Sequence, residues 1–318
     1  MKNQNKTNWL NVIKRTGILW VFLLIVGVLA ILSPSFITPV NLMNIAKQIS
    51  INGILAVGMT YVIISGGIDL SVGAIVAISG VCAAFFATQN STYPLILPIL
   101  AGIAVGGVIG IINGVGIAYG EFPPFIMTLA SMITVRGFGL VITDGRPIFN
   151  LVDKFNNLAS GFTFGIPNLI YFLVLVFALG IFVLNKTVFG KRIFAVGGNE
   201  EAAMFSGINT RRIKLYVYLI SGVLSGFCGV LLASRITSGN ATVGEGYEMN
   251  AISAAVIGGV SMSGGTGNLI GTLIGALIIG VINNGLDILA VSPFYQKVIQ
   301  GLIIATAIYL DTRAKKKN

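Results

Sequence analysis

Long runs of apolar residues, separated by short polar stretches, repeat along this 318-residue chain. A helix needs about 20 apolar residues to cross the roughly 30 Å hydrocarbon core of a bilayer. Windows of that length predict ten membrane-spanning helices, and hence an all-α polytopic membrane protein whose residues 1–318 form one transmembrane domain. The eighth window is short and rich in glycine, which favours a broken or re-entrant segment over a full crossing. The windows cover residues 16–33, 44–64, 70–88, 95–118, 124–142, 168–185, 213–234, 248–262, 267–289 and 295–311.

The composition agrees with a chain that lies mostly in lipid. Hydrophobic residues make up 55% of it and charged residues only 9%. Soluble domains carry roughly 25% charged residues. A globule with so few charges has too little polar surface to face water, so the bulk of the surface is expected to contact lipid.

Fourteen of the 20 basic residues gather in three segments that flank apolar runs, and the net charge of the chain is +10. Cytoplasmic loops of membrane proteins carry an excess of lysine and arginine, and ten crossings place all three segments, with both termini, in the cytoplasm. A nucleic-acid-binding face would interleave basic and aromatic residues on one folded surface, so no nucleic-acid partner is expected. The three segments hold Lys2, Lys6, Lys14 and Arg15; Lys186, Lys191, Arg192, Arg211, Arg212 and Lys214; and Arg313, Lys315, Lys316 and Lys317.

Small residues stand at helical spacing inside several windows. Gly102, Gly106, Gly110 and Gly114 form a stripe on one helix face. In lipid, helices associate through close packing rather than through the hydrophobic effect, so such a stripe favours close approach of a neighbouring helix. A role as a gating hinge is the alternative.

An ungapped similarity joins residues 53–76 to residues 251–274. The matches include Ser65-Gly66-Gly67 with Ser263-Gly264-Gly265, and both stretches read as apolar helix, Ser-Gly-Gly break, apolar helix. Both breaks face the cytoplasm in the predicted topology, which would make this an internal parallel repeat of the kind found in transporters. Chance matches in an apolar background are the alternative, so the repeat is a hypothesis.

The longest cytoplasmic stretch, residues 186–212, contains signals for a short helix. Asn199 is a good N-cap, and Glu200 with Glu201 then lies in the first turn, where the helix dipole favours negative charge. Gly207 can adopt the left-handed conformation that ends a helix. A short rigid helix across the cytoplasmic ends of the spans is a surface that a peripheral protein can bind and move.

The spacing Glu201-Ala202-Ala203-x-x-x-Gly207 resembles the coupling loop of importer-type ABC permeases, which docks on the ATP-binding subunit. Over nearly its whole length the chain is similar to the ribose-type permeases of carbohydrate ABC importers. The stretches that carry this resemblance are Gly58–Gly73 (GMTYVIISGGIDLSVG), Pro124–Ala130 (PFIMTLA), Asp144–Pro147 (DGRP), Gly246–Ser253 (GYEMNAIS) and Val256–Gly267 (VIGGVSMSGGTG).

The resemblance implies several partners and a location. They are a second permease copy or a sister permease, an ATP-binding subunit with two nucleotide-binding modules, an extracytoplasmic sugar-binding protein, and the lipid of a bacterial inner membrane. The chain has no Walker-type phosphate loop, so ATP and Mg²⁺ are expected on the partner and no cofactor on this chain, which is not an enzyme. The implied substrate is a monosaccharide, ribose or another pentose or hexose, although related permease groups carry nucleosides, a furanosyl signalling molecule and branched-chain amino acids.

Polar residues inside the windows are candidates for the translocation pathway, because polar groups in lipid are costly. We expect Asp69 to cap the helix that follows it. Arg136 lies well inside a window and requires a partner such as Asp287 or a backbone carbonyl. For the uncharged candidates, hydrogen bonding between helices is the competing role. The candidates are Asp69, Asn113, Thr128, Arg136, Asn283 and Asn284.

Other functional classes fit the sequence less well. An ion-coupled secondary transporter for a small polar solute needs acidic residues in mid-span, and the windows offer almost none. A passive channel or a structural membrane protein leaves the loop at 186–212 without a role. An intramembrane enzyme is disfavoured because the chain has no histidine and no serine–base or cysteine–base arrangement.

Overall fold

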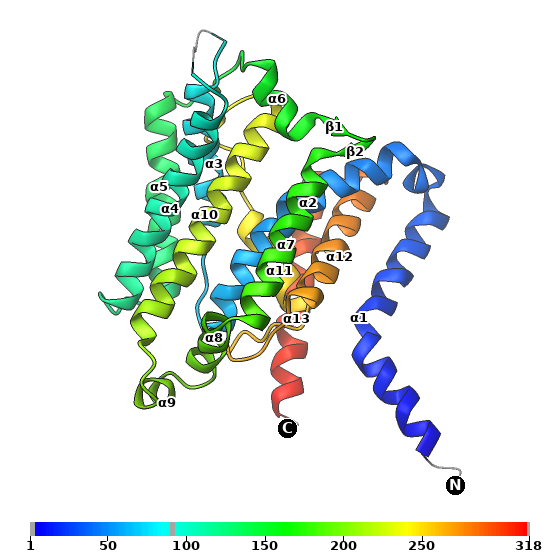
Figure 1. The fold of residues 1–318 in the computed structure, drawn as a ribbon. Coiled ribbons are helices and arrows are strands. Elements are labelled where there is room, and N and C mark those ends of the chain that lie inside the picture. Colours follow the sequence, from blue (N-terminus) through cyan, green and yellow to red (C-terminus); the bar gives the residue numbers. More distant parts are fainter. Residues whose placement is uncertain (1–3, 90–92, 317–318) are drawn as a thin grey trace.

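The computed structural model describes residues 4–89 and 93–316, and it is almost entirely helical (Figure 1). Each predicted window corresponds to one helix. These helices are α1 (Gln4–Leu32), α2 (Pro39–Ile64), α3 (Val72–Phe86), α4 (Ile96–Ala118), α5 (Pro124–Thr143), α7 (Asn168–Lys186), α10 (Thr210–Ile236), α11 (Tyr247–Ile257), α12 (Leu269–Ile288) and α13 (Pro293–Lys316). Among the helices of the described residues, six are long and apolar enough to cross a membrane. Gly17–Leu32 and Val72–Phe86 are shorter apolar helices. The fold is that of a polytopic membrane protein, and the number of crossings stays a prediction.

Smaller elements lie between these helices. The 3₁₀ helix η1 (Pro34–Ile37) joins α1 to α2, and α6 (Asp153–Ser160) precedes a hairpin of β1 (Phe162–Thr163) and β2 (Ile166–Pro167). Two short helices, α8 (Val188–Gly198) and α9 (Glu200–Phe205), fill the loop between α7 and α10. The sequence predicted α9 but not α8, α6 or the hairpin.

The eighth window differs from its predicted extent of 248–262. Helix α11 stops at Ile257, and the backbone turns at Gly259 with φ of +86°. Its 11 residues reach only about 16 Å at 1.5 Å per residue, about half the apolar thickness of a bilayer. This window is therefore broken, as its glycine content favoured.

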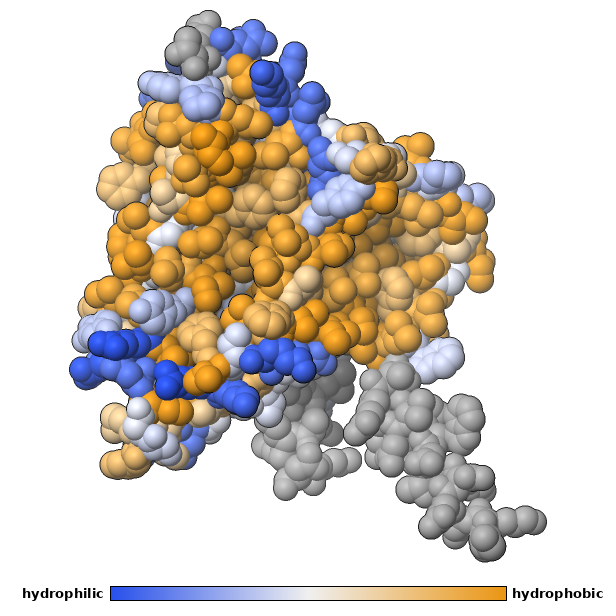
Figure 2. All heavy atoms as spheres, viewed as in Figure 1, coloured by the Kyte–Doolittle hydropathy of each residue, from blue (hydrophilic) through white to orange (hydrophobic). Residues whose placement is uncertain are grey.

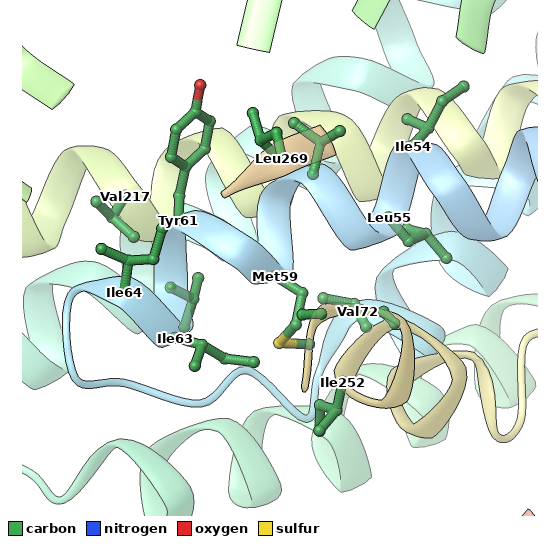
Figure 3. Packing of buried hydrophobic residues seen from close by; sticks show 14 of the residues in the cluster. Ile54, Leu55, Met59, Tyr61, Ile63, Ile64, Val72, Val217, Ile252 and Leu269 are labelled. Atoms are coloured by element: carbon green, nitrogen blue, oxygen red, sulfur yellow. The ribbon is translucent and has the colours of Figure 1, made fainter. Parts of the chain in front are cut away.

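The centre of the molecule is α2, which is almost entirely buried (Figure 3). Its apolar side chains share one buried cluster with Val217 of α10, Ile252 of α11 and Leu269 of α12. A helix that is apolar on every side is expected in the interior of a helical bundle. Helices α7, α10, α11 and α12 pack around α2, and the outer helices of the bundle expose large apolar side chains.

The glycine stripe of α4 packs against α10. A Cβ added to Gly106 would lie 2.6 Å from Gly226 Cα, and one added to Gly222 would lie 2.7 Å from Gly110 Cα. These separations are closer than side chains allow, so the two backbones touch directly. The close-packing role of the stripe is confirmed.

Two polar layers enclose an apolar belt (Figure 2). The beginning of α1, the end of α13 and the pair α8–α9 lie on one side of the molecule, whereas α6 and the β1–β2 hairpin lie on the opposite side (Figure 1). This arrangement agrees with the predicted grouping of both termini and the 186–212 loop. Which side faces the cytoplasm stays a prediction.

Candidate functional site: the α8–α9 segment and a buried polar network

Helix α9 is built by local signals at both of its ends. The Asn199 side-chain oxygen Oδ1 accepts a hydrogen bond from the Ala202 backbone N–H at 2.8 Å, and Glu200 and Glu201 occupy the first turn. Gly207 has φ of +80°, and the next N–H, that of Ile208, returns to the Ala203 carbonyl at 3.1 Å. The predicted cap and the predicted stop are both confirmed.

The outer face of α9 is apolar as well as acidic. Phe205 is 85% exposed and Met204 55% exposed, while Ala203 is buried against the rest of the protein. Within the part of the chain that the structure describes, Phe205 is almost uncovered and Met204 is about half covered, although both lie in a polar layer. The sequence pattern predicted roles for the glutamates and alanines of this segment but not for Met204 and Phe205, whose only signal is that they are apolar residues in a short capped helix.

One ion pair connects α9 to the bundle, and a second joins the start of α10 to the connection between α4 and α5. Lys214 Nζ of α10 lies 2.6 Å from Glu200 Oε2, and Arg211 lies 3.2 Å from Glu121 in the connection between α4 and α5. Ion pairs at the surface contribute about 0–1 kcal/mol each, so the Lys214–Glu200 pair orients α9 more than it stabilises it. Glu201, in contrast, is exposed and available to a partner.

Asp69 is the centre of a buried polar network in the connection between α2 and α3. Its Oδ1 accepts from the Ser71 backbone N–H at 3.0 Å and from the Ser71 hydroxyl, and its Oδ2 accepts from the Ser221 hydroxyl of α10 at 2.7 Å. Asn113 of α4 donates from Nδ2 to the Ser71 hydroxyl oxygen at 2.8 Å. Thr128 Oγ1 of α5 lies 3.3 Å from the carbonyl oxygen of Ile68. Asp69, Asn113 and Thr128 are thus brought together.

The expectation that Asp69 caps α3 is wrong in its detail. The N-cap residue of α3 is Ser71, and the helix begins at Val72. Asp69 stands two residues before that cap and uses its second oxygen to bond Ser221. Its first oxygen still accepts from the Ser71 N–H at the start of α3, so the carboxylate joins that start to α10.

The other candidates lie apart from this network. Arg136 Nη1 donates to the carbonyl oxygens of Ala241 and Val243 at 3.1 and 3.0 Å, which confirms the backbone-carbonyl alternative. The Asp287 alternative is wrong, because Asp287 accepts from Gln296 instead. On α12, Asn284 exchanges two hydrogen bonds with Asn41 at 2.9 and 2.8 Å, and the half-buried Asn283 precedes it. Asn283 and Asn284 therefore lie beside α1 and α2, away from Asp69.

Comparison with known proteins places this architecture in a family. The profile of a family described as "Branched-chain amino acid transport system / permease component" matches residues 41–308. The ribose import permease protein of Bacillus subtilis (strain 168) is 45% identical over 313 residues, which cover 98% of this chain and 96% of the relative. The chain belongs to the carbohydrate ABC importer permeases. Other members share most of its length, and no solved structure matches it.

Two further permeases show the spread of substrate names among these relatives. The L-arabinose ABC transporter permease protein of Azospirillum brasilense is 40% identical over 299 residues, or 94% of this chain and 88% of the relative. The galactose/methyl galactoside import permease protein of Escherichia coli (strain K12) is 39% identical over an alignment of 336 residues that covers 100% of this chain and 100% of the relative. The relatives bear the names of transport subunits, and the chain is a membrane-embedded sugar permease of this family.

Proposed function

We propose that this permease forms the membrane path of an ATP-driven importer for a monosaccharide, which is ribose or another pentose or hexose. The names of the relatives support this substrate class, since they refer to ribose, arabinose and galactose. Two copies of the chain pair in the inner membrane of a bacterium. An extracytoplasmic binding protein delivers the sugar, and a separate subunit with two nucleotide-binding modules holds ATP and Mg²⁺.

The observation that carries the proposal is the exposed face of α9. Phe205 and Met204 are exposed on a capped helix, and this helix lies on the same side of the molecule as the beginning of α1 and the end of α13 (Figure 1). Large exposed apolar side chains rimmed by polar residues are typical of protein-binding surfaces. Aromatic side chains that fill a pocket on a partner carry much of the binding energy of such interfaces. We assign α9 to the ATPase subunit as its docking element.

We assign the sugar pathway to the face of α5 that meets residues 237–246. Arg136 lies seven residues, or about 10 Å, before the end of α5 at Thr143. Its guanidinium holds the carbonyls of Ala241 and Val243, so the loop reaches that far along α5. The loop also carries the exposed ion pair of Glu245 with Lys297 of α13, at 3.2 Å. Exposed charges of this kind require water rather than lipid, which favours an aqueous path enclosed by the second copy.

The docking assignment is tested with Phe205→Ala. The matched control is Phe164→Ala, because Phe164 is 95% exposed at the tip of the β1–β2 hairpin on the opposite side. Loss of a buried phenylalanine contact is worth roughly 1.5–3 kcal/mol, or about a tenfold to hundredfold loss of affinity for the ATPase subunit. Co-purification and titration of the purified permease with its ATPase subunit measure this. Equal affinity of the two variants would refute the assignment of α9.

The substrate assignment is tested in proteoliposomes that contain the permease with its ATPase subunit and binding protein. Labelled ribose, arabinose and galactose are offered separately, and ATP is supplied on the side of the membrane that holds the ATPase subunit. We expect import of one pentose or hexose that stops when ATP is withheld. Import that ignores ATP but collapses on addition of an ionophore would favour the ion-coupled alternative and end this proposal.

A further inference from the structure

Three glycine pairs from distant parts of the chain meet at one point beside α9. Gly66-Gly67 follows the end of α2, Gly264-Gly265 lies in the loop between α11 and α12, and Gly197-Gly198 ends α8. The Gly265 backbone N–H donates to the Ile64 carbonyl oxygen at 2.9 Å, which joins the first two segments. A Cβ added to Gly264 would lie 2.7 Å from Gly197 O and 3.1 Å from Gly66 Cα, so all three segments are in contact. We call this contact the glycine junction.

The junction is a contact of backbone with backbone. A Cβ on Gly197 would overlap the Ile64 carbonyl oxygen and lie 2.7 Å from the Gly265 nitrogen. A Cβ on Gly265 would lie 2.7 Å from Gly198 Cα. Side chains can change rotamer to absorb a small displacement, whereas backbone atoms in direct contact cannot. A movement of one segment is therefore passed to the other two with little loss.

The junction contains the two Ser-Gly-Gly breaks and lies between α9 and the starts of α3 and α12. On one side, Gly197 stands two residues before Asn199, the cap of α9. On the other side, Gly66-Gly67 leads within two residues to Asp69, whose carboxylate bonds Ser221 of α10. Gly264-Gly265 leads to Asn268, which caps α12 through the N–H groups of Ile270 and Gly271. One end of the junction thus adjoins the exposed helix, and the other adjoins the starts of α3 and α12.

We propose that the glycine junction transmits the movement of α9 to both breaks at once, so that Gly197 and Gly265 are positioning residues for transport. This inference rests on the proposed docking of an ATPase subunit on α9. When that subunit moves α9, Gly197 displaces the Ile64 carbonyl and the Gly265 amide together. The connections to α3 and α12 then shift in step, which links ATP turnover to the opening of the path.

The chain offers a matched pair of variants for the test. Gly197→Ala and Gly198→Ala each add one methyl group at adjacent positions, but an added Cβ on Gly198 has nothing within 4 Å. The complete transporter is reconstituted in proteoliposomes, and sugar import and ATP hydrolysis are measured together. We expect Gly197→Ala to lower the sugar imported per ATP hydrolysed by roughly two- to thirtyfold, the range of typical coupling energies. Gly198→Ala should match the wild type, and equal ratios in the two variants would overturn the inference.

A measurement on the wild-type complex covers the case in which Gly197→Ala does not fold. Hydrogen exchange is followed at residues 258–268 and 199–207, with and without ATP and vanadate to trap the closed ATPase. We expect the protection of both segments to change together, because the Gly265 amide is hydrogen-bonded across the junction. A change confined to residues 199–207 would overturn the inference. If Phe205→Ala retains full affinity for the ATPase subunit, the docking proposal itself has failed, whatever the Gly197→Ala and Gly198→Ala variants show.

Discussion

Asp69→Ala tests whether the buried network holds the connection between α2 and α3. The Asp69 carboxylate accepts hydrogen bonds from the Ser71 N–H, the Ser71 hydroxyl and the Ser221 hydroxyl. All three residues are buried, so no water replaces a lost acceptor. The substitution removes every one of these bonds and leaves three donors to find other partners.

The magnitude follows from the fate of each donor. A buried donor without an acceptor costs about 1–3 kcal/mol. The Ser71 N–H precedes the first turn of α3, where no earlier helical carbonyl is available, so it bears the full penalty. The two hydroxyls can rotate toward nearby carbonyls and recover part of theirs. The sum is about 2–5 kcal/mol, which lowers the melting temperature by about 4–10 °C at roughly 2 °C per kcal/mol.

The two free cysteines supply the assay. Cys228 is buried and Cys82 is partly buried, so a dye that fluoresces on reaction with thiols reports unfolding in detergent. Asp69→Asn is the matched control, because an amide keeps an acceptor for Ser71 and can donate to the Ser221 oxygen. We expect its melting temperature to lie within a few degrees of the wild type. An Asp69→Ala melting temperature equal to that of Asp69→Asn would refute the hydrogen-bond reasoning.

Two other outcomes can be measured with the same preparations. Gly222→Ala should destabilise the protein by about 1–3 kcal/mol in the thiol-dye assay, because its methyl group would overlap the carbonyl oxygen of Gly106. Gly137→Ala is its control, since an added Cβ there has nothing within 4 Å, and similar losses in both would contradict the packing argument. Asn199→Ala removes the cap of α9 and should cost about 1 kcal/mol of local helix stability. Affinity for the ATPase subunit should then fall several-fold, and an unchanged affinity would show that docking does not need a preformed helix.

The sequence predicted those features that depend on a few neighbouring residues. Each of the ten apolar windows corresponds to a helix. A long apolar segment in lipid must pair its own backbone N–H and C=O groups, and a helix does this. The ends of α9 followed from Asn199 and Gly207, whose cap and left-handed turn act within one helical turn. The position of α11 was predicted, but its end at Ile257 was not, because several glycines there were equally suited to a break.

The sequence did not predict hydrogen-bond partners that lie far apart in the chain. Asp69 was assigned to the helix that follows it, whereas its second oxygen bonds Ser221, 152 residues away. Asn284 was a candidate for the pathway, yet it pairs with Asn41, 243 residues away. Polar side chains have several partners of similar chemistry, and only the packing of α2, α4, α10 and α12 selects among them.

By itself, the sequence determined that this chain is a helical membrane protein with a capped helix in a basic loop, because hydropathy and capping are local properties. Only the tertiary structure decided that the Ser-Gly-Gly breaks meet each other and Gly197-Gly198. A glycine pattern states that backbones can approach closely but does not say which ones do. That choice follows from how the surrounding helices fill space around α2, and it places the glycine junction directly beside α9.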